Sequence, residues 1–484
     1  MTKRAPTFGE SVFSILSMVV IIAVGYAGFG VRVEMLMIIS AIVAALVARR
    51  CGYRWADLES GICQKIVQAT PAILIMWTIG IVIATFIFSG SIPMIIYYGL
   101  KLINPQYLYL CTFLVCCVLS VVTGTSWGSA GTMGVAMMGV AAGLGVPLHI
   151  TAAAVVSGVI FGDKLSPLSE TTNLAPLCAG CNIYDHIASM MWTTLPSSII
   201  SAVVFWLCGM QIEVTSTGLP QEALDTMASL DEIYHWNLLL LLPFLVILVC
   251  AFTKQPPVPT MIGASLLAII IGCAYQGFDV VQGFAASVNG FTTNMIFDGE
   301  VAPAVSSLLN RGGMKSMVGI VIVIYCGYGY AAIISKAGFL KTALEPVVSR
   351  AKNRVTLIGA TLITDFIIMA CAGSSYPAHI MTAEMYKRAY LEQNLDPRVL
   401  SRTLEDVGTM MAPWIPWGTS GAFYIGTLGV GIFGMEGFGI WSPNTYLNPV
   451  FALIVAAVGI GMYKMTPEKQ KEELAKLDAQ EEAL

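Results

Sequence analysis

Charged side chains are scarce in this sequence of 484 residues, of which Asp, Glu, Lys and Arg make up only 11%. Soluble domains carry about 25% of such residues, so the composition excludes a protein that is surrounded only by water. The net charge is −4 and is spread over many segments, which provides no basic surface for nucleic acid. We therefore expect neither a soluble fold nor a nucleic-acid partner.

The sequence also lacks a disulfide framework and a cleavable signal peptide. Most of its twelve cysteines lie in apolar runs, where cysteine behaves as a small hydrophobic residue. Cys178 and Cys181 form a lone C-x-x-C, and a structural zinc site needs four ligands, so a metal or redox site there is the weaker interpretation. The N-terminus has a basic start and a long apolar run without a small-residue cleavage site, which predicts an uncleaved first span.

Long apolar runs are what the sequence has in abundance. Hydrophobic residues make up 56% of the chain, and its mean hydropathy is +0.77. A helix needs about 20 apolar residues to cross a bilayer, and runs of this kind recur from end to end. The sequence thus predicts an all-α polytopic membrane protein with candidate spans at 11–29, 33–48, 72–89, 107–122, 132–145, 149–161, 194–209, 236–252, 258–274, 315–335, 355–372, 420–433 and 446–463.

Two stretches of the chain show the same order of features. In each, a span leads through a loop to a second span that breaks at glycine and is followed by a polar segment with proline: 72–89, 107–122, Gly124 and Pro167, then 315–335, 355–372, Gly373 and Pro413. Matched, interrupted apolar segments in two halves are typical of transporter binding sites.

Loop charges predict how the two halves are oriented. The loop after 72–89 carries only Lys101, whereas its counterpart is strongly basic, with Lys336, Lys341, Arg350, Lys352 and Arg354. The segment before 72–89 is basic (Arg49, Arg50, Arg54 and Lys65), and the segment before 315–335 is acidic at Asp298 and Glu300. Basic loops stay in the cytoplasm, so equivalent loops lie on opposite faces and the repeat is inverted.

The expected organisation follows from these features. We predict N-terminal spans, a first inverted repeat, a linker loop with connecting spans, a second inverted repeat, a C-terminal span and a charged cytoplasmic tail: 1–50, 51–210, 211–275, 276–435, 436–465 and 466–484.

The densest polar stretch within the apolar body is "FGDKLSPLSETTNLAP", residues 161–176. Pro167 removes a helical hydrogen bond, and an opened backbone in hydrocarbon persists only inside protein or beside a watery cavity. Carboxylates at membrane depth mark functional sites, so Asp163 and Glu170 are the candidate coupling acids. The alternatives are an extramembrane loop in which Asp163 and Lys164 form a solvated pair, or a helix-capping role for Asp163.

Oxygen-bearing side chains in these segments suit a hard cation such as Na+, which prefers oxygen ligands. Burial raises the pKa of a carboxylic acid, so one acid can hold a proton and release it when a cation arrives. Glu170 and Asn173 are the expected Na+ ligands. The other candidate ion- or substrate-binding residues are Thr125, Ser126, Ser129, Asp163, Ser166, Ser169, Thr171, Thr172, Ser374, Ser375, Thr419 and Ser420.

Residues 124–128, "GTSWG", match the G-x-S-x-G pattern of serine hydrolases. An intramembrane hydrolase with Ser126 as nucleophile and His149 or His186 as base is therefore an alternative. The hydrolase interpretation gives no role to the matching break at Gly373. We therefore interpret Ser126 as a residue that lines a transport path.

Several other polar and aromatic residues have two interpretations each. Asp365 lies mid-span and has a transport or a packing role, and Glu405 and Asp406 are helix caps or ligands. The remaining ones are expected at solvated or interfacial positions: Glu384, Lys387 and Arg388 on a helix face, and His149, His186, Trp414 and Trp417 near span ends.

Three segments resemble signature segments of the NhaC-type sodium/proton antiporter family, within the ion transporter superfamily: "TGTSWGSAGTMGVA", "GDKLSPLSETTNLAP" and "LSRTLEDVGTMMAPWIPWGTSGAF". The similarity extends from about Gly52 to Tyr463. It implies two inverted-topology repeats whose re-entrant hairpins and broken helices meet at mid-membrane, and, at superfamily level, an elevator-like motion. The sequence departs from the family pattern at Glu170, where Asp is usual, at Gly418, where Asn is usual, and at "AGSSYPAH", with its Pro377 and His379.

The resemblance and the residues together predict a secondary Na+/H+ antiporter, with Na+ and H+ as transported ions and no cofactor. The alternative within transport is a Na+- or H+-coupled carrier of a small organic acid, such as malate or lactate, or of an amino acid. We expect it in the lipid bilayer of the cytoplasmic (inner) membrane, with both termini in the cytoplasm. The sequence is also compatible with a homodimer.

Overall fold

The computed structural model describes residues 3–212, 221–253, 255–297, 299 and 303–482. These residues form helices, and their one β-bridge is an isolated pairing of Leu395 with Lys464. Within these described ranges, eight helices are long and apolar enough to cross a membrane, or nine if a pair bent by 100° at residues 233–238 counts as one span. The prediction of an all-α polytopic membrane protein is thus confirmed.

The first half of the chain begins with two helices that precede the first repeat. Thr7 caps the first of them, because its hydroxyl accepts from the backbone of Glu10. A π-helical segment, Ala23–Gly28, continues it. The helices of this half are α1 (Phe8–Ile22), α2 (Val33–Arg50), α3 (Trp55–Phe88), α4 (Ser91–Leu102), α5 (Leu108–Thr123), α6 (Ser126–Ser129), α7 (Val135–Gly143), α8 (Leu148–Leu165), α9 (Glu170–Ala179) and α10 (Ile183–Met210).

The second half repeats this order after a connecting region. The connecting helices are α11 (Gln221–Ile233), α12 (Leu242–Phe252), α13 (Pro257–Ala274), α14 (Val280–Asn289) and α15 (Pro303–Leu309). The helices that follow are α16 (Val318–Lys336), α17 (Phe339–Ser349), α18 (Arg354–Ala372), α19 (Ser375–Glu392), α20 (Pro397–Gly408), α21 (Thr419–Leu428), α22 (Pro443–Val458) and the tail helix α23 (Pro467–Glu482).

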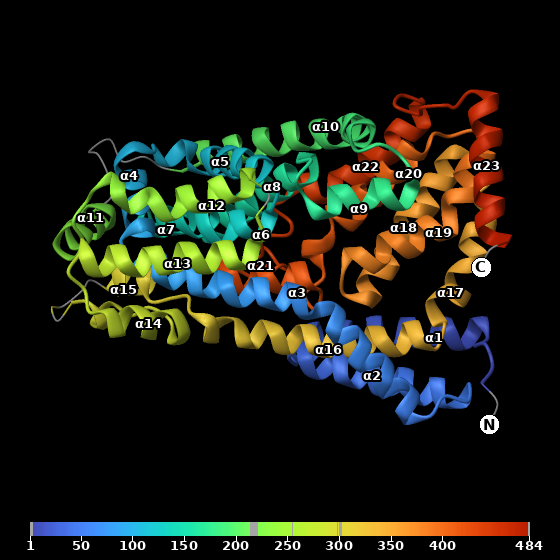
Figure 1. The fold of residues 1–484 in the computed structure, drawn as a ribbon, viewed down its shortest axis with the longest axis horizontal. Coiled ribbons are helices and arrows are strands. Elements are labelled where there is room, and N and C mark those ends of the chain that lie inside the picture. The colour runs from blue at the N-terminus through green and yellow to red at the C-terminus, as the bar shows by residue number, and fades with distance from the viewer. Residues whose placement is uncertain (1–2, 213–220, 254, 298, 300–302, 483–484) are drawn as a thin grey trace.

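The two halves share one order of elements, with α6, the π-helical segment Ala130–Gly134 and α7 of the first half in the place of α19 in the second, and their long helices run in opposite directions. A long helix, a left-handed glycine and a short helix open each half, as α3, Gly90 and α4 and as α16, Gly338 and α17. Helices α3 and α16 pack side by side (Figure 1). Gly61, early in α3, lies near Lys336 at the end of α16, and Gly313, just before α16, donates a 2.6 Å hydrogen bond to Gly80, late in α3. The matching long helices are therefore antiparallel, as the inverted repeat predicts.

The helices before each repeat pack against the opposite half. Helix α2, which precedes α3, contacts α16, and α13, which precedes α16, contacts α3. Each half thus packs a preceding helix against the long helix of the other half.

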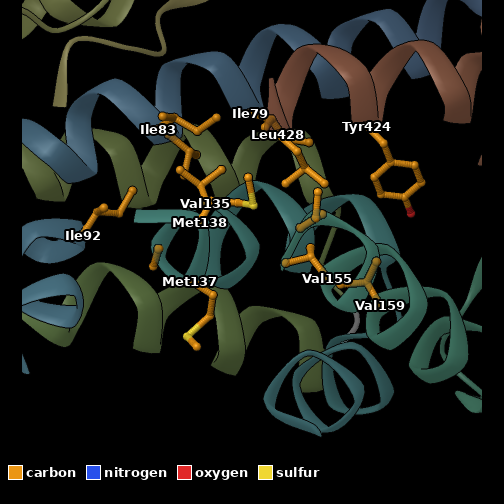
Figure 2. Close-up of a cluster of buried hydrophobic side chains, with 14 of the residues drawn as sticks. Ile79, Ile83, Ile92, Val135, Met137, Met138, Val155, Val159, Tyr424 and Leu428 are labelled. Atoms are coloured by element: carbon orange, nitrogen blue, oxygen red, sulfur yellow. The ribbon is translucent and has the colours of Figure 1, made fainter. Parts of the chain in front are cut away.

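Part of the apolar core joins the two halves as well. Figure 2 shows Tyr424 and Leu428 of α21 beside Ile79 of α3 and Val155 of α8. All four side chains are at most 2% exposed. Burying a large apolar side chain contributes about 1.5–3 kcal/mol, so this cluster holds a broken helix of the second half against the first.

Several predicted span boundaries need correction. The span expected at 194–209 begins at Ile183, and the one expected at 420–433 is the ten-residue helix α21, which ends at Leu428. Helix α3 does not begin near residue 72 but at Trp55, where Asp57 accepts a 2.9 Å hydrogen bond from the backbone of Arg54. Lys65 therefore lies within a helix of 34 residues rather than in a loop. Asp298 and Glu300, on which the acidic character of the second segment rested, lie outside the described residues, as do 213–220 and 254 of the predicted linker region.

Candidate functional site

Each repeat contains a helix break built in the same way. Helix α5 ends at Gly124, with a φ of 66°, and α18 ends at Gly373, with a φ of 72°. Glycine adopts such left-handed backbone without the steric penalty of a side chain. Thr125 then caps α6 by accepting from the backbone of Gly128 over 3.2 Å, and Ser374 caps α19 by accepting from Tyr376 over 3.4 Å.

The second break of each repeat follows α8 and α20. Helix α8 ends at Leu165 and α9 begins at Glu170, while α20 ends at Gly408 and α21 begins at Thr419. Between the halves of each broken span, backbone carbonyls lose their helical partners. The Thr172 hydroxyl compensates for two of them, because it lies 3.0 and 3.1 Å from the carbonyl oxygens of Asp163 and Lys164.

These breaks surround a cavity of about 1300 Å³ to which both repeats contribute. Twelve of the fourteen predicted site residues line it: Thr125, Ser126, Ser129, Asp163, Ser169, Glu170, Thr171, Asn173, Ser374, Ser375, Thr419 and Ser420. Ser166 and Thr172 do not. Ser166 is fully buried and its hydroxyl accepts from the backbone of Leu168, so both side chains stabilise the break rather than face the cavity.

Asp163 is the more enclosed of the two candidate acids. Its residue is 8% exposed, and its Oδ2 accepts a 2.8 Å hydrogen bond from the hydroxyl of Ser126. Ser126 follows the first break and Asp163 precedes the next, so this contact joins the two breaks of one repeat. A solvated pair of Asp163 with Lys164 is excluded, since both are buried and Lys164 bonds to Asp406 instead.

Glu170 and Asn173, on the first turn of α9, are exposed where they line the cavity. The hydroxyl of Tyr376, from the second repeat, donates to Oε2 of Glu170. The side-chain nitrogen of Asn173 donates to the carbonyls of Pro167 and Ser169, at 2.9 and 2.6 Å. This leaves the amide oxygen of Asn173 as the atom that can face a cation.

Four broken helices begin at the cavity. Ser126, Glu170, Ser375 and Thr419 are the first residues of α6, α9, α19 and α21, and all four line it. A helix N-terminus carries a partial positive charge. The cavity therefore combines two carboxylates with hydroxyl oxygens and converging positive helix ends.

A family model described as "Na+/H+ antiporter family" matches residues 158–460 of the chain. The chain belongs to the Na+/H+ antiporter family. An uncharacterised Na(+)/H(+) antiporter of Haemophilus influenzae is 39% identical over 96% of this chain and 98% of its own length. The Na(+)/H(+) antiporter NhaC of Alkalihalophilus pseudofirmus is 33% identical over 96% and 98%, and a malate-2H(+)/Na(+)-lactate antiporter of Bacillus subtilis is 32% identical over 89% and 91%.

In this antiporter-family chain, Ser126 does not have the partner that a hydrolase needs. A serine nucleophile is activated by a histidine within hydrogen-bond distance. The Ser126 hydroxyl instead donates to Asp163. His186 bonds to Ser401, and His149 lies against the ring of Trp441.

A buried ion network that the sequence did not reveal lies outside the cavity lining. Nζ of Lys164 is 2.7 Å from Oδ1 of Asp406 and 2.9 Å from the amide oxygen of Asn448. Thr193 also donates to Asp406, and Arg402 approaches its second oxygen at 3.8 Å. Asp406 is thus neither a helix cap nor a cavity ligand but the partner of a lysine in the other repeat.

Other predictions can be compared with the structure directly. His186 is fully buried in α10, so its expected interfacial position is wrong. Trp414 and Trp417 are half-buried, and their ring nitrogens donate to Thr445 and to the carbonyl of Ala370. In the part of the chain that is described, no group of three or more His, Cys, Asp or Glu side chains that could hold a metal ion occurs at Cys178 and Cys181 or elsewhere. Polar residues that line the cavity but were not among the predicted site residues are Lys65, Gln68, Tyr328, Tyr376, Thr409 and Tyr424.

Proposed function

We propose that the protein exchanges Na+ for H+ across the cytoplasmic membrane, with the cation bound in the cavity between the repeats. The observation that carries this proposal is Asp163, a nearly buried carboxylate on the wall of an open cavity. A buried carboxylate without a cation is costly unless it takes up a proton. Na+ and H+ then compete for the same acid.

The cation would be held by oxygens of the first repeat. Asp163 and Ser126 provide one side, and Glu170 with the amide oxygen of Asn173 provides the other. Tyr376 links Glu170 to the second repeat, so movement of one repeat against the other would change the position of this acid. Such a link lets the site respond to the direction in which the cavity opens.

The orientation proposed for the chain follows from its basic ends. Both termini lie at the same end of the molecule (Figure 1). The backbone of Arg4 bonds to Cys51, next to Arg49 and Arg50, and the loop that precedes α18 carries Arg350 and Lys352. Basic loops remain cytoplasmic, so both termini are assigned to the cytoplasm.

A second candidate is the exchange of a small organic anion or amino acid coupled to Na+ or H+. A cavity of about 1300 Å³ is far larger than one ion requires, and it is lined by Lys65 as well as by four helix N-termini. Positive helix ends favour carboxylate groups. The similarity to a relative named for malate and lactate exchange supports the same candidate.

Purified protein in liposomes distinguishes the two candidates. A pulse of NaCl, with choline chloride as the control, should dissipate an imposed pH gradient if Na+/H+ exchange is the function. Labelled malate, lactate and amino acids are then offered under the same gradients. Uptake of a solute, together with the absence of any Na+-driven pH change, would replace the first candidate with the second.

A further inference from the structure

Three ionisable side chains outside the cavity form a separate buried group. Nδ1 of His379, on α19, lies 3.6 Å from Oδ1 of Asp365 on α18. Its Nε2 lies 3.7 Å from Oε1 of Glu405 on α20. All three side chains are fully buried. Among the described ion pairs, His379 is the histidine that has a carboxylate facing each ring nitrogen.

Unlike the Lys164–Asp406 pair, this triad has no supporting hydrogen bonds. Within the described residues, both ring nitrogens of His379 and all four carboxylate oxygens of Asp365 and Glu405 lack a hydrogen-bond partner. Charges buried in this way are costly. Two carboxylates around a neutral imidazole would be the most costly state, so the triad favours binding a proton.

The charges around the triad act in both directions. Asp365 and Glu405 favour a positive charge on His379, whereas Lys164 on α8 opposes it and favours the ionised form of Glu405. A positive charge on His379 in turn disfavours one on His186 of α10. Within the ion pairs that connect these side chains, three cations face three carboxylates only when His379 is protonated: Lys164, Arg402 and His379 against Asp365, Glu405 and Asp406. Loss of the proton from His379 leaves one negative charge uncompensated.

One backbone segment separates the triad from the cavity. A side chain at Gly408 would collide with the group, because a Cβ there would lie 2.2 Å from Cε1 of His379 and 2.6 Å from Oδ2 of Asp365. The carbonyl of the same Gly408 accepts a hydrogen bond from Ser375, which lines the cavity. Glu405 also acts electrostatically on Asp163. A positive charge that enters the cavity therefore changes the electrostatic potential at the triad.

We propose that the Asp365–His379–Glu405 triad is a proton-carrying site separate from the cavity, and that it releases its proton when a cation binds at Asp163. This inference rests on the proposed Na+/H+ exchange. It adds a second proton-binding group to the exchange: Asp163 gives up its own proton to the cation in the cavity, and His379 holds a further proton outside it. The two sites interact through the field between Glu405 and Asp163, without sharing a ligand.

Nuclear magnetic resonance of ring-labelled histidine tests the triad directly in the full-length protein. The chain has four histidines, so the signal of His379 is assigned by its loss in H379Q, with H186Q as the matched buried control. Between about pH 5 and about pH 9, the His379 signal should change from imidazolium to neutral ring. Saturating Na+, compared with choline, should lower the pH of half-protonation by about one unit, which is a tenfold coupling. D163N should abolish the Na+ effect.

A His379 signal that responds neither to pH nor to Na+ would overturn the proposal and leave the triad as a packing feature. In liposomes, H379Q should retain Na+/Na+ exchange and the competition of Na+ with H+ at Asp163, and it should move fewer protons per Na+ than the wild type. Equal loss of both activities, with an unresponsive His379 signal, would also contradict a proton-carrying role. Wild-type protein that moves no Na+ at all would instead contradict the proposed exchange, and the pH response of His379 would then decide the triad by itself.

Discussion

The hydroxyl of Ser126 donates a 2.8 Å hydrogen bond to Oδ2 of Asp163, although the two residues lie on different broken helices. This bond orients the most enclosed acid of the cavity, which is 8% exposed. It also places a hydroxyl oxygen next to the carboxylate, as a cation with oxygen ligands requires. Substitutions at Ser126 and at Asp163 should therefore both reduce Na+-driven proton movement, and the loss should be larger at Asp163.

S126A should weaken Na+-driven proton movement roughly tenfold to a hundredfold, because a hydrogen bond to a charged group contributes about 1.5–3 kcal/mol. D163N should abolish it, since the competing acid is gone. The measurement is the initial rate of pH-gradient dissipation in liposomes. Ser120→Ala is the control: its hydroxyl bonds to the carbonyl of Val159 at 2.6 Å outside the cavity, so its loss should leave the rate near the wild-type value.

The Lys164–Asp406 pair should govern stability, because it joins the two repeats and is completely buried. Removing one partner leaves a buried charge without compensation, which costs about 3–5 kcal/mol. K164M should therefore lower the unfolding temperature in detergent strongly, and the double variant K164M/D406L should recover part of the loss. K476M, which removes an exposed lysine of the tail helix, should not change the transition. A double variant less stable than K164M would argue against the pair.

Gly124 should not tolerate a side chain. Its φ of 66° disfavours other residues, and a Cβ there would lie 2.5 Å from the Cβ of Leu168. Left-handed backbone costs a non-glycine residue about 1–2 kcal/mol, and the clash would displace the neighbouring break as well. G124A should reduce both stability and transport. Gly319→Ala is the matched control, since a Cβ at this position of α16 meets no atom within 4 Å, and it should remain fully active.

Asp396, at the start of α20 and outside the apolar spans, should make stability depend on acid pH. Burial opposes its ionisation, but hydrogen bonds from the backbone of Arg398 and from the side chains of Lys469 and Arg398 lower its pKa. A lowered pKa gives stability that is present above the unfolded value, near about 3.9, and lost as the pH falls through the folded value. D396N should be less stable than wild type near pH 7, and this difference should shrink below about pH 4. A difference that stays constant with pH would contradict the assignment.

The helix breaks, and the positions of the two candidate acids in the cavity lining, have local signals in the sequence. Gly124 and Gly373 each follow an apolar run and precede a hydroxyl residue. The helix break and its capping residue can therefore be recognised from a few adjacent residues. Asp163 and Glu170 stand out because carboxylates are rare in apolar surroundings. The basic residues Arg49, Arg50, Arg350 and Lys352 gave part of the signal for the inverted repeat, although Lys65 lies within a helix and Asp298 and Glu300 lie outside the described residues. All of these can be recognised without knowing which helices are neighbours.

The features that were missed depend on contacts between distant segments. Lys164 looked like the partner of Asp163, but its ammonium group points to Asp406, 242 residues further along the chain. His186 was expected at an interfacial position, but it is buried and hydrogen-bonded to Ser401 of the second repeat. The first turns of α3 were taken for a loop because Arg54 and Lys65 interrupt the apolar pattern, although helices readily accommodate such residues at their polar ends. Tertiary packing, not composition, decides each of these positions.

The central claim is that Na+ and H+ compete for the acid at Asp163. Proton release on Na+ binding tests it most directly: purified protein in a weakly buffered solution with a pH-sensitive dye receives Na+, with choline as the control. The account predicts that the wild type releases protons when Na+ is added and that D163N releases none. Equal release by the two proteins, or no release by either, would contradict it.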